Sequence, residues 1–330
     1  VNNLGAARIR LRSLISVVEE RKRHHYKPVM GHLGYVRQPE FTEEMRKKHT
    51  ILCPQMAPIH FDLLEAAFGH SGYNVVILRD CSKAVVDEGL KYVNNDACYP
   101  SILIVGQLIH ALNSGKYDLR NTSVMITQTG GACRATNYVG MLKKALKDSG
   151  HGDIPLISLN VVGLEKQSGF KLTMPLAIRA FMAIIYGDVL SRCLYKVRPY
   201  EVTKGSADAL YEKWRLFLRG DMKSISLPNF NNIVKDFSEF PVLDIKKPRV
   251  GLVGEILVKF HPVANNNIIG LLENEGCEVV VPDLMGFFYY ICSHGKTKRE
   301  LLYTARTKAF AEDAAVKAFR FMERSYRKAV

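Results

Sequence analysis

The chain has 330 residues, of which 47% are hydrophobic and 24% are charged. This composition is close to that of average globular proteins, and the absence of a run of about 18 apolar residues argues against a membrane span. The net charge of +14 raises the question of a nucleic-acid partner, but the basic residues concentrate toward the two ends, without an RNA-binding signature or zinc-finger spacing. We therefore expect a cytoplasmic protein that binds neither nucleic acid nor membrane.

Strand and helix patterns alternate along the first half of the chain. Residues 1–48 are basic and predict a helix followed by a linker that glycine and proline interrupt. Apolar runs predict four strands, at 50–56, 73–80, 123–129 and 154–163. Amphipathic segments between or after them predict three helices, at 61–72, 101–115 and 138–150. This alternation is typical of a parallel sheet with helices on both faces, so we assign residues 49–200 to a first α/β domain.

The second half of the chain starts a similar alternation. The apolar segment 175–197 predicts a buried helix or helix pair that closes the first domain, and residues 201–245 predict a helical connection. Residues 246–330 form the second α/β domain, with a strand at 249–258, a helix at 265–276, a strand at 277–283 and a basic helical region after them. Two strands are few for a parallel sheet, so we expect this domain to be incomplete.

Cys98 and Cys133 stand where a sheet of this kind binds ligands. Such sites lie beyond the carboxyl ends of the strands, where helix N-termini direct backbone N–H groups toward the ligand. Cys133 follows a predicted strand and precedes a predicted helix, and Cys98 directly precedes another helix. The field of a helix N-terminus favours the thiolate, which is the form that binds iron. Gly130 and Gly131 allow a tight backbone turn beside a bulky group.

The other five cysteines are weaker candidates. Cys53 and Cys81 also follow or end predicted strands, so a four-cysteine site in the first domain is an alternative to their being core residues. Cys193 and Cys277 are interpreted as packing residues, and Cys292 beside His294 is a further possible ligand. The spacing of the seven cysteines matches no local ferredoxin pattern.

Four polar residues complete the candidate site. Gln128 and Thr129 precede the glycine turn, where they either hydrogen-bond a cluster or substrate or are ordinary turn residues. His60, after the first strand, is a candidate acid or base near neutral pH, with a structural role as the alternative. Glu255 lies in an apolar segment of the second domain, where a carboxylate rarely occurs without a partner.

The sequence is most recognisable in two segments, KYVNNDACYPSILIVGQLIHALNSGKYD and SVMITQTGGACRATNYVGMLKKAL. They resemble the 2-hydroxyacyl-CoA dehydratase and double-cubane cluster family, specifically the later portion of the large acyl-CoA dehydratase activase-related proteins. The similarity runs from PQMAPIHFDLLEAAF through KVRPYE and resumes at VGEILVKFHPVANNNIIGLLENEGCEVVVPD. The resemblance implies two flavodoxin-like, doubly wound domains that hold an iron–sulfur cluster, either [4Fe-4S] or double-cubane, through three cysteines per unit. Cys98 and Cys133 match two of these ligands; we expect the third beyond residue 330, with Cys292 as the alternative.

The resemblance also implies a function. Proteins of this kind receive an electron from an ATP-hydrolysing activator and pass it to a substrate such as an acyl-CoA, in a lyase or low-potential reductase system that works anaerobically. The chain contains no P-loop, so nucleotide chemistry is expected in a partner, and a homodimer or heterodimer is compatible with this function. The alternative is a non-catalytic α/β interaction module without a bound cluster.

Overall fold

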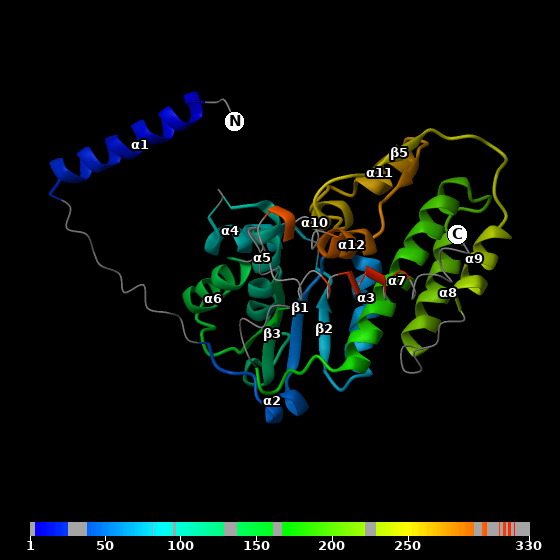
Figure 1. The fold of residues 1–330 in the computed structure, drawn as a ribbon, viewed down its shortest axis with the longest axis horizontal. Coiled ribbons are helices and arrows are strands. Elements are labelled where there is room, and N and C mark those ends of the chain that lie inside the picture. Colours follow the sequence, from blue (N-terminus) through cyan, green and yellow to red (C-terminus); the bar gives the residue numbers. More distant parts are fainter. Residues whose placement is uncertain are drawn as a thin grey trace. The chain divides into compact units, whose positions relative to one another are not determined.

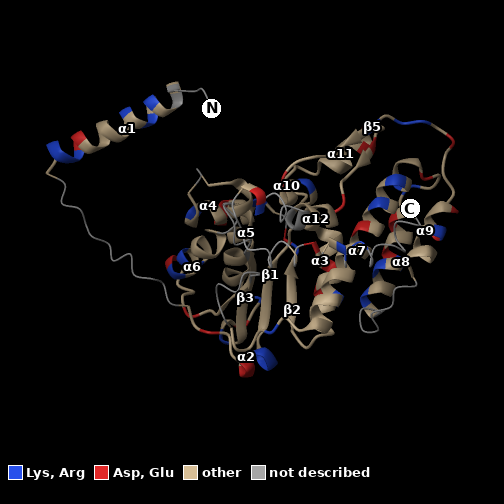
Figure 2. Ribbon diagram, in the orientation of Figure 1, with Lys and Arg blue, Asp and Glu red and all other residues tan. Residues whose placement is uncertain are grey.

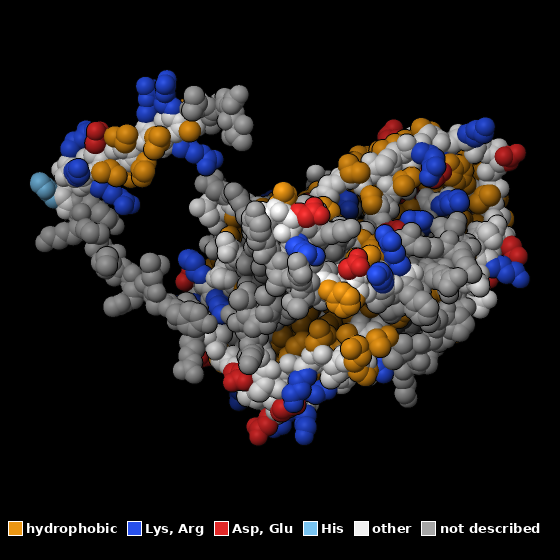
Figure 3. Space-filling view, viewed as in Figure 1, with side chains coloured by type: hydrophobic (Ala, Val, Ile, Leu, Met, Phe, Trp, Pro, Cys, Tyr) orange, Lys and Arg blue, Asp and Glu red, His pale blue; other side chains and the backbone are white. Residues whose placement is uncertain are grey.

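The computed structural model describes residues 4–25, 38–80, 82–94, 97–128, 137–160, 167–221 and 229–293, with scattered positions from 299 to 320. The chain divides into two units, Val1–Arg37 and Gln38–Val330. The first unit contains helix α1 (Leu4–Arg23), along which Lys and Arg predominate among the charged residues (Figure 2). Apolar side chains of α1 are exposed, as Figure 3 shows, with Ile9 at 68% and Leu14 at 60%.

A four-stranded parallel sheet forms the centre of the second unit, in the order β2-β1-β3-β4 (Figure 1). Its strands are β1 (Thr50–Pro54), β2 (Val75–Leu78), β3 (Thr122–Gln128) and β4 (Leu156–Asn160). Leu52 and Val124 belong to the apolar cluster on one face, whereas Ile51 and Met125 belong to the cluster on the other. The strands are almost continuously apolar because both faces are covered.

Helices cover the two faces of this sheet as the sequence predicts (Figure 1). On one face lie α4 (Lys83–Tyr92), α5 (Tyr99–Asn113) and α6 (Tyr138–Asp148). On the other lie α3 (Pro58–Gly69) and α7 (Met174–Val197). The short helix α2 (Glu43–Lys48) and the 3-10 turn η1 (Leu119–Asn121) precede β1 and β3. The prediction of an α/β fold with a parallel sheet and helices on both of its faces is therefore confirmed for this part of the chain.

Helix α7 is a single helix rather than a helix pair, and the 3-10 turn η3 (Arg198–Tyr200) follows it. Among the described residues, Met174–Tyr200 is the one helical stretch long and apolar enough to cross a membrane, and 61% of its most apolar window is buried inside the protein. Tyr186 and Leu190 of α7 lie in one apolar cluster with Leu63 of α3 and Phe230 of a later helix. These contacts are those of a core helix in a globular protein.

The remainder of the unit consists of helices around a small second sheet. Helices α8 (Ser206–Asp221) and α9 (Asn229–Ser238) pack on α7. A parallel pair, β5 (Arg249–Gly251) and β6 (Glu278–Val280), follows together with α10 (Ile256–Phe260), α11 (Ile268–Asn274) and α12 (Met285–Ser293). The strand predicted at 249–258 is only partly correct: β5 ends at Gly251, and its second half is helix α10.

Candidate functional site

The carboxyl edge of the four-stranded sheet is where this topology places a ligand. The chain passes from β1 to β2 on one side and then to β3 and β4 on the other, so the order of strands reverses between β1 and β3. Gln55, directly after β1, donates its backbone N–H to Gln107 Oε1 at 2.9 Å, and Gln107 Nε2 donates to the Gln55 carbonyl at 3.1 Å. Buried Gln107 of α5 thereby fixes the backbone that leaves β1 at this edge.

Cys98 lies at the N-terminus of α5, immediately before Tyr99 and with Pro100 in the first turn. The sulfur is partly buried and lies 3.1 Å from the hydroxyl of Tyr138, the first residue of α6. The N-termini of α5 and α6 therefore meet at the Cys98 sulfur. Their contact joins α5, which precedes β3, to α6, which follows it.

Several predicted site residues fall outside the described residues. The connection between β3 and α6, which contains Thr129, Gly130, Gly131 and Cys133, is not described. Cys81 is not described either. Gln128 ends β3, where its backbone pairs with Asn160 of β4. Cys292 is the eighth residue of α12, and its side chain is likewise not described.

Helix α10 packs against the apolar cluster that contains Cys98 and also against His60 of α3. Its residue Leu257 belongs to the apolar cluster that includes Cys98 and Met56, while the ring of Phe260 lies 5.4 Å from the ring of His60. Glu255 caps the helix, because its Oε2 accepts a hydrogen bond from the Val258 N–H at 3.2 Å. The predicted site residue Glu255 thus has a local structural contact, which explains why the chain turns from strand to helix here.

His60 lies in the core, with 1% of its surface exposed. Its Nε2 is 2.8 Å from Asp188 Oδ1 on α7, and Asp188 also accepts the backbone N–H groups of Leu284 at 2.6 Å and Met285 at 3.0 Å. This arrangement links α3, α7 and the start of α12. His60 was a predicted site residue, whereas its partner Asp188 was not. The one sign of Asp188 in the sequence is that it is a carboxylate within an otherwise apolar helical segment.

His261, which the sequence analysis also missed, directly follows α10 and is 1% exposed. Neither ring nitrogen has a hydrogen-bond partner among the residues that the structure describes. Burial lowers the pKa of His261 to about 4, so the imidazole is neutral at physiological pH. The position of a histidine between two apolar residues, in FHPV, carries no periodic signal that would have identified it.

Two other cysteines have the environment of core residues. Cys53 of β1 is 8% exposed and lies with Ile51 on the sheet face that α3 and α7 cover, opposite the face against which Cys98 packs. Burial, with a smaller contribution from Glu65, raises the pKa of Cys53 to about 12. Burial also raises the pKa of Cys193 to about 11. Both thiols are therefore protonated at neutral pH and are poor metal ligands in this state.

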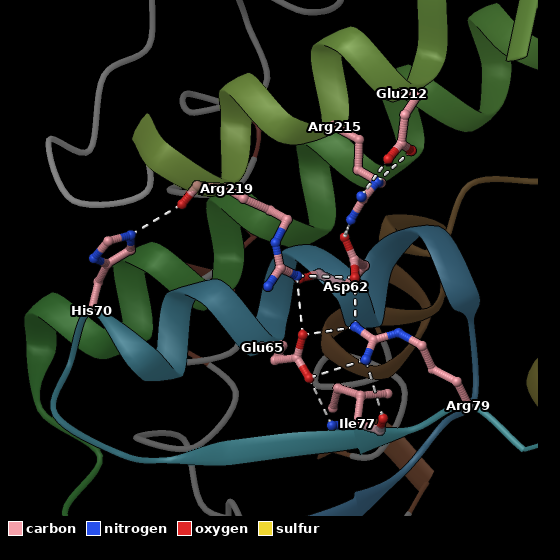
Figure 4. Close-up of polar contacts among 8 residues, drawn as sticks. All are labelled: Asp62, Glu65, His70, Ile77, Arg79, Glu212, Arg215 and Arg219. Atoms are coloured by element: carbon pink, nitrogen blue, oxygen red, sulfur yellow. Dashed lines mark hydrogen bonds and ion pairs between the residues drawn. The ribbon is translucent and has the colours of Figure 1, made fainter. Parts of the chain in front are cut away.

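A cluster of opposite charges joins α3 to α8 and to the end of β2 (Figure 4). Asp62 accepts Arg79 Nη2 at 2.6 Å and Arg219 Nη1 at 2.9 Å, and it also pairs with Arg215. Glu65 accepts the same arginine nitrogens, at 2.7 Å from Arg79 and 3.1 Å from Arg219. Burial opposes ionisation of Asp62, but hydrogen bonds from Arg215 and Arg79 lower its pKa overall. Arg215 also pairs with Glu212, so three carboxylates face three guanidinium groups, and the cluster acts as a structural link.

Within the residues that the structure describes, no three His, Cys, Asp or Glu side chains lie close enough together to hold a metal ion. The described part of the sheet edge thus contributes one sulfur donor, Cys98. The fold is that of an α/β protein with a four-stranded parallel sheet, and Cys98 lies at the carboxyl edge of that sheet. Comparison of the chain with protein-family models, curated proteins and solved structures found no match.

Proposed function

We propose that the chain is the iron–sulfur-cluster-binding component of an anaerobic reductase or dehydratase system that an ATP-hydrolysing activator supplies with electrons. The observation that supports this most is the position of Cys98, half-buried at the N-terminus of α5 on the carboxyl edge of the sheet. Its sulfur is 3.1 Å from Tyr138, which begins α6. Cys133 stands five positions before Tyr138 in the sequence, in the connection that leads to the same helix.

The surroundings of Cys98 suit a cluster ligand. Thiolates are the usual ligands of iron–sulfur clusters, and the neighbouring helix α5 is apolar enough to exclude water from one side of the site. A bound cluster would supply one-electron transfer at low potential, and the protein would determine ligation, hydrogen bonding to sulfur and access of solvent. In this proposal Cys133 is a second ligand, and Gln128, Thr129, Gly130 and Gly131 contact the cluster.

The remaining parts of the proposal concern the substrate side and the second sheet. We propose that β5, α11 and β6, which form a parallel βαβ unit, belong to a second flavodoxin-like domain. Glu255, between β5 and α10, would act on an acyl-CoA or a similarly hard-to-reduce substrate. His60 would act as the acid or base. The protein would work in the cytoplasm, as a homodimer or heterodimer.

Iron and acid-labile sulfide analysis tests this function directly. Protein made under anaerobic conditions should be brown, contain iron and sulfide, and give an electron paramagnetic resonance signal when reduced. Cys98→Ala and Cys133→Ala should each lose the cluster, because each removes a ligand. Cys193→Ala is the matched control and should keep it, since that thiol is partly buried against the apolar cluster of α3 and α7, away from the sheet edge. Wild-type protein without iron would refute the proposal.

One observation favours a second function, that of a non-catalytic interaction module. The Cys98 sulfur already has a hydrogen-bonding neighbour and packs against an apolar cluster, which accounts for a cysteine at this position without a metal. Iron-free wild-type protein, together with a Cys98→Ala variant that keeps the fold and loses a partner interaction, would support this alternative.

A further inference from the structure

Helix α1 carries an apolar stripe along one side. Its members recur at spacings of four, three and four residues, which places their side chains on one face of the helix: Ala7, Leu11, Leu14 and Val18. These side chains are exposed, with Leu11 at 58% and Leu14 at 60%. A row of exposed aliphatic side chains is typical of a surface that another molecule covers.

The first unit offers no second helix to cover this stripe. Among the residues that the structure describes in Val1–Arg37, α1 is the one helical element. Isolated helices have little stability in water, because most helical stability in proteins comes from the packing of an apolar face. Burial of the stripe by another helix would therefore stabilise α1.

The charges beside the stripe are basic. In the heptad pattern that the stripe defines, Arg8, Arg10 and Lys22 fall at the flanking positions e and g. The acidic residues of α1, Glu19 and Glu20, fall at the outward positions b and c. Charges at e and g decide which helices associate, so this arrangement repels a second copy of α1 in either orientation and attracts a helix with carboxylates at these positions.

A membrane surface fits α1 less well than an acidic helix does. Helices that lie in the interface of a membrane usually insert Trp or Phe side chains beside leucine, whereas α1 contains no aromatic residue. An apolar stripe of a and d positions is also narrower than the apolar face of most surface helices, and it is the seam typical of coiled coils.

We propose that α1 is a docking helix that forms a coiled coil with an acidic amphipathic helix of a partner protein. The stripe supplies the apolar seam, and Arg8, Arg10 and Lys22 form ion pairs with carboxylates of the partner helix. The docking surface belongs to the first unit alone, so its test does not depend on whether the chain holds a cluster.

The test uses the full chain and a synthetic helical peptide with leucine at positions a and d and glutamate at e and g. Fluorescence anisotropy should show binding that weakens as the salt concentration rises, and a peptide with lysine in place of glutamate should not bind. Leu14→Gln should weaken binding by about tenfold or more, because it removes a buried leucine from the seam. Ile9→Gln is the matched control, since Ile9 is similarly exposed, at 68%, but lies on the opposite side of α1.

A charge reversal separates recognition of the partner from the stability of the helix. The double variant Arg8→Glu, Arg10→Glu should lose the glutamate peptide and bind the lysine peptide instead. A helix that is merely weakened by substitution would bind neither peptide, and that result would overturn the assigned role of these arginines.

Three results would overturn the inference. The first is a Kd weaker than about 1 mM for the glutamate peptide. The second is a wild-type dimer in sedimentation equilibrium that Leu14→Gln dissociates, because a second copy would then cover the stripe. The third is binding to vesicles that contain phosphatidylserine, abolished by Leu14→Gln, without binding to the peptide. Each of these results would leave the iron analysis of the proposed function unaffected.

Discussion

His261 is a buried imidazole to which no described residue hydrogen-bonds. It is 1% exposed, and burial lowers its pKa to about 4. In the unfolded chain a histidine titrates near its ordinary pKa of about 6.5. Protonation therefore favours the unfolded state, because only that state solvates the charged ring.

We expect the protein to lose stability through His261 as the pH falls from about 6.5 to about 4. The loss should reach on the order of 3 kcal/mol, since each unit of pKa difference corresponds to about 1.4 kcal/mol. His261→Leu should flatten the dependence of the urea-denaturation midpoint on pH in this window. His24→Leu, at an exposed position directly after α1, is the control, and an equal pH dependence in wild type and His261→Leu would contradict the expectation.

Helices α4 and α5 cross at two glycines that permit an unusually close approach. A Cβ atom added to Gly106 would lie 2.0 Å from the Val85 carbonyl oxygen, and one added to Gly89 would lie 2.1 Å from the Ile102 carbonyl oxygen. Both obstacles are backbone atoms, which cannot move aside without shifting a helix. The crossing positions the N-terminus of α5, where Cys98 lies.

Gly106→Ala should therefore lower the free energy of unfolding by about 2 kcal/mol or more, the range typical of overpacked cores. Gly140→Ala in α6 is the matched control: it also replaces a helical glycine, but no atom lies within 4 Å of the added methyl group. That variant should be unchanged or up to about 1 kcal/mol more stable, because alanine favours helix. Urea denaturation of both variants tests the difference, and equal stabilities would show that the helices can separate freely.

Elements with strong apolar patterns were predictable, and those set by local capping or tertiary packing were not. The four strands of the central sheet appear near their predicted positions because both faces are buried and their sequences are almost wholly apolar. The predicted strand at 249–258 failed in its second half because the Glu255 carboxylate caps the Val258 N–H and starts α10. Helix α9 lies within the helical connection predicted at 201–245, and its three buried residues, Phe230, Ile233 and Phe237, recur at helical spacing.

The site was predictable only in part, for a similar reason. The position of Cys98 at a helix start follows from local sequence, since turn residues precede it and Pro100 follows. The contact of Cys98 with Tyr138 and that of His60 with Asp188 join residues 40 and 128 positions apart. No periodicity encodes such pairs, because they depend on which helices the completed sheet brings together.

At the scale of the whole molecule, Asp188 connects the central sheet to the segment that follows β6. Its carboxylate accepts His60 Nε2 from α3 and the backbone N–H groups of Leu284 and Met285, and it is 2% exposed. Asp188→Ala leaves these three buried donors without an acceptor, a change that typically costs about 3 to 5 kcal/mol. The N-terminus of α12 should suffer most, because its first N–H groups have no other partner within the helix.

Hydrogen exchange measured along the chain tests this role of Asp188. In Asp188→Ala we expect faster exchange in β6 and α12, with slow exchange retained in β1 and β3, because the small sheet would open without unfolding the large one. Asp208→Ala, which removes a half-exposed carboxylate paired with Arg198, is the control and should change stability by less than about 1 kcal/mol. Equal acceleration in all strands would instead show that the two sheets unfold together. In that case Asp188 would stabilise the fold as a whole rather than the attachment of its second sheet.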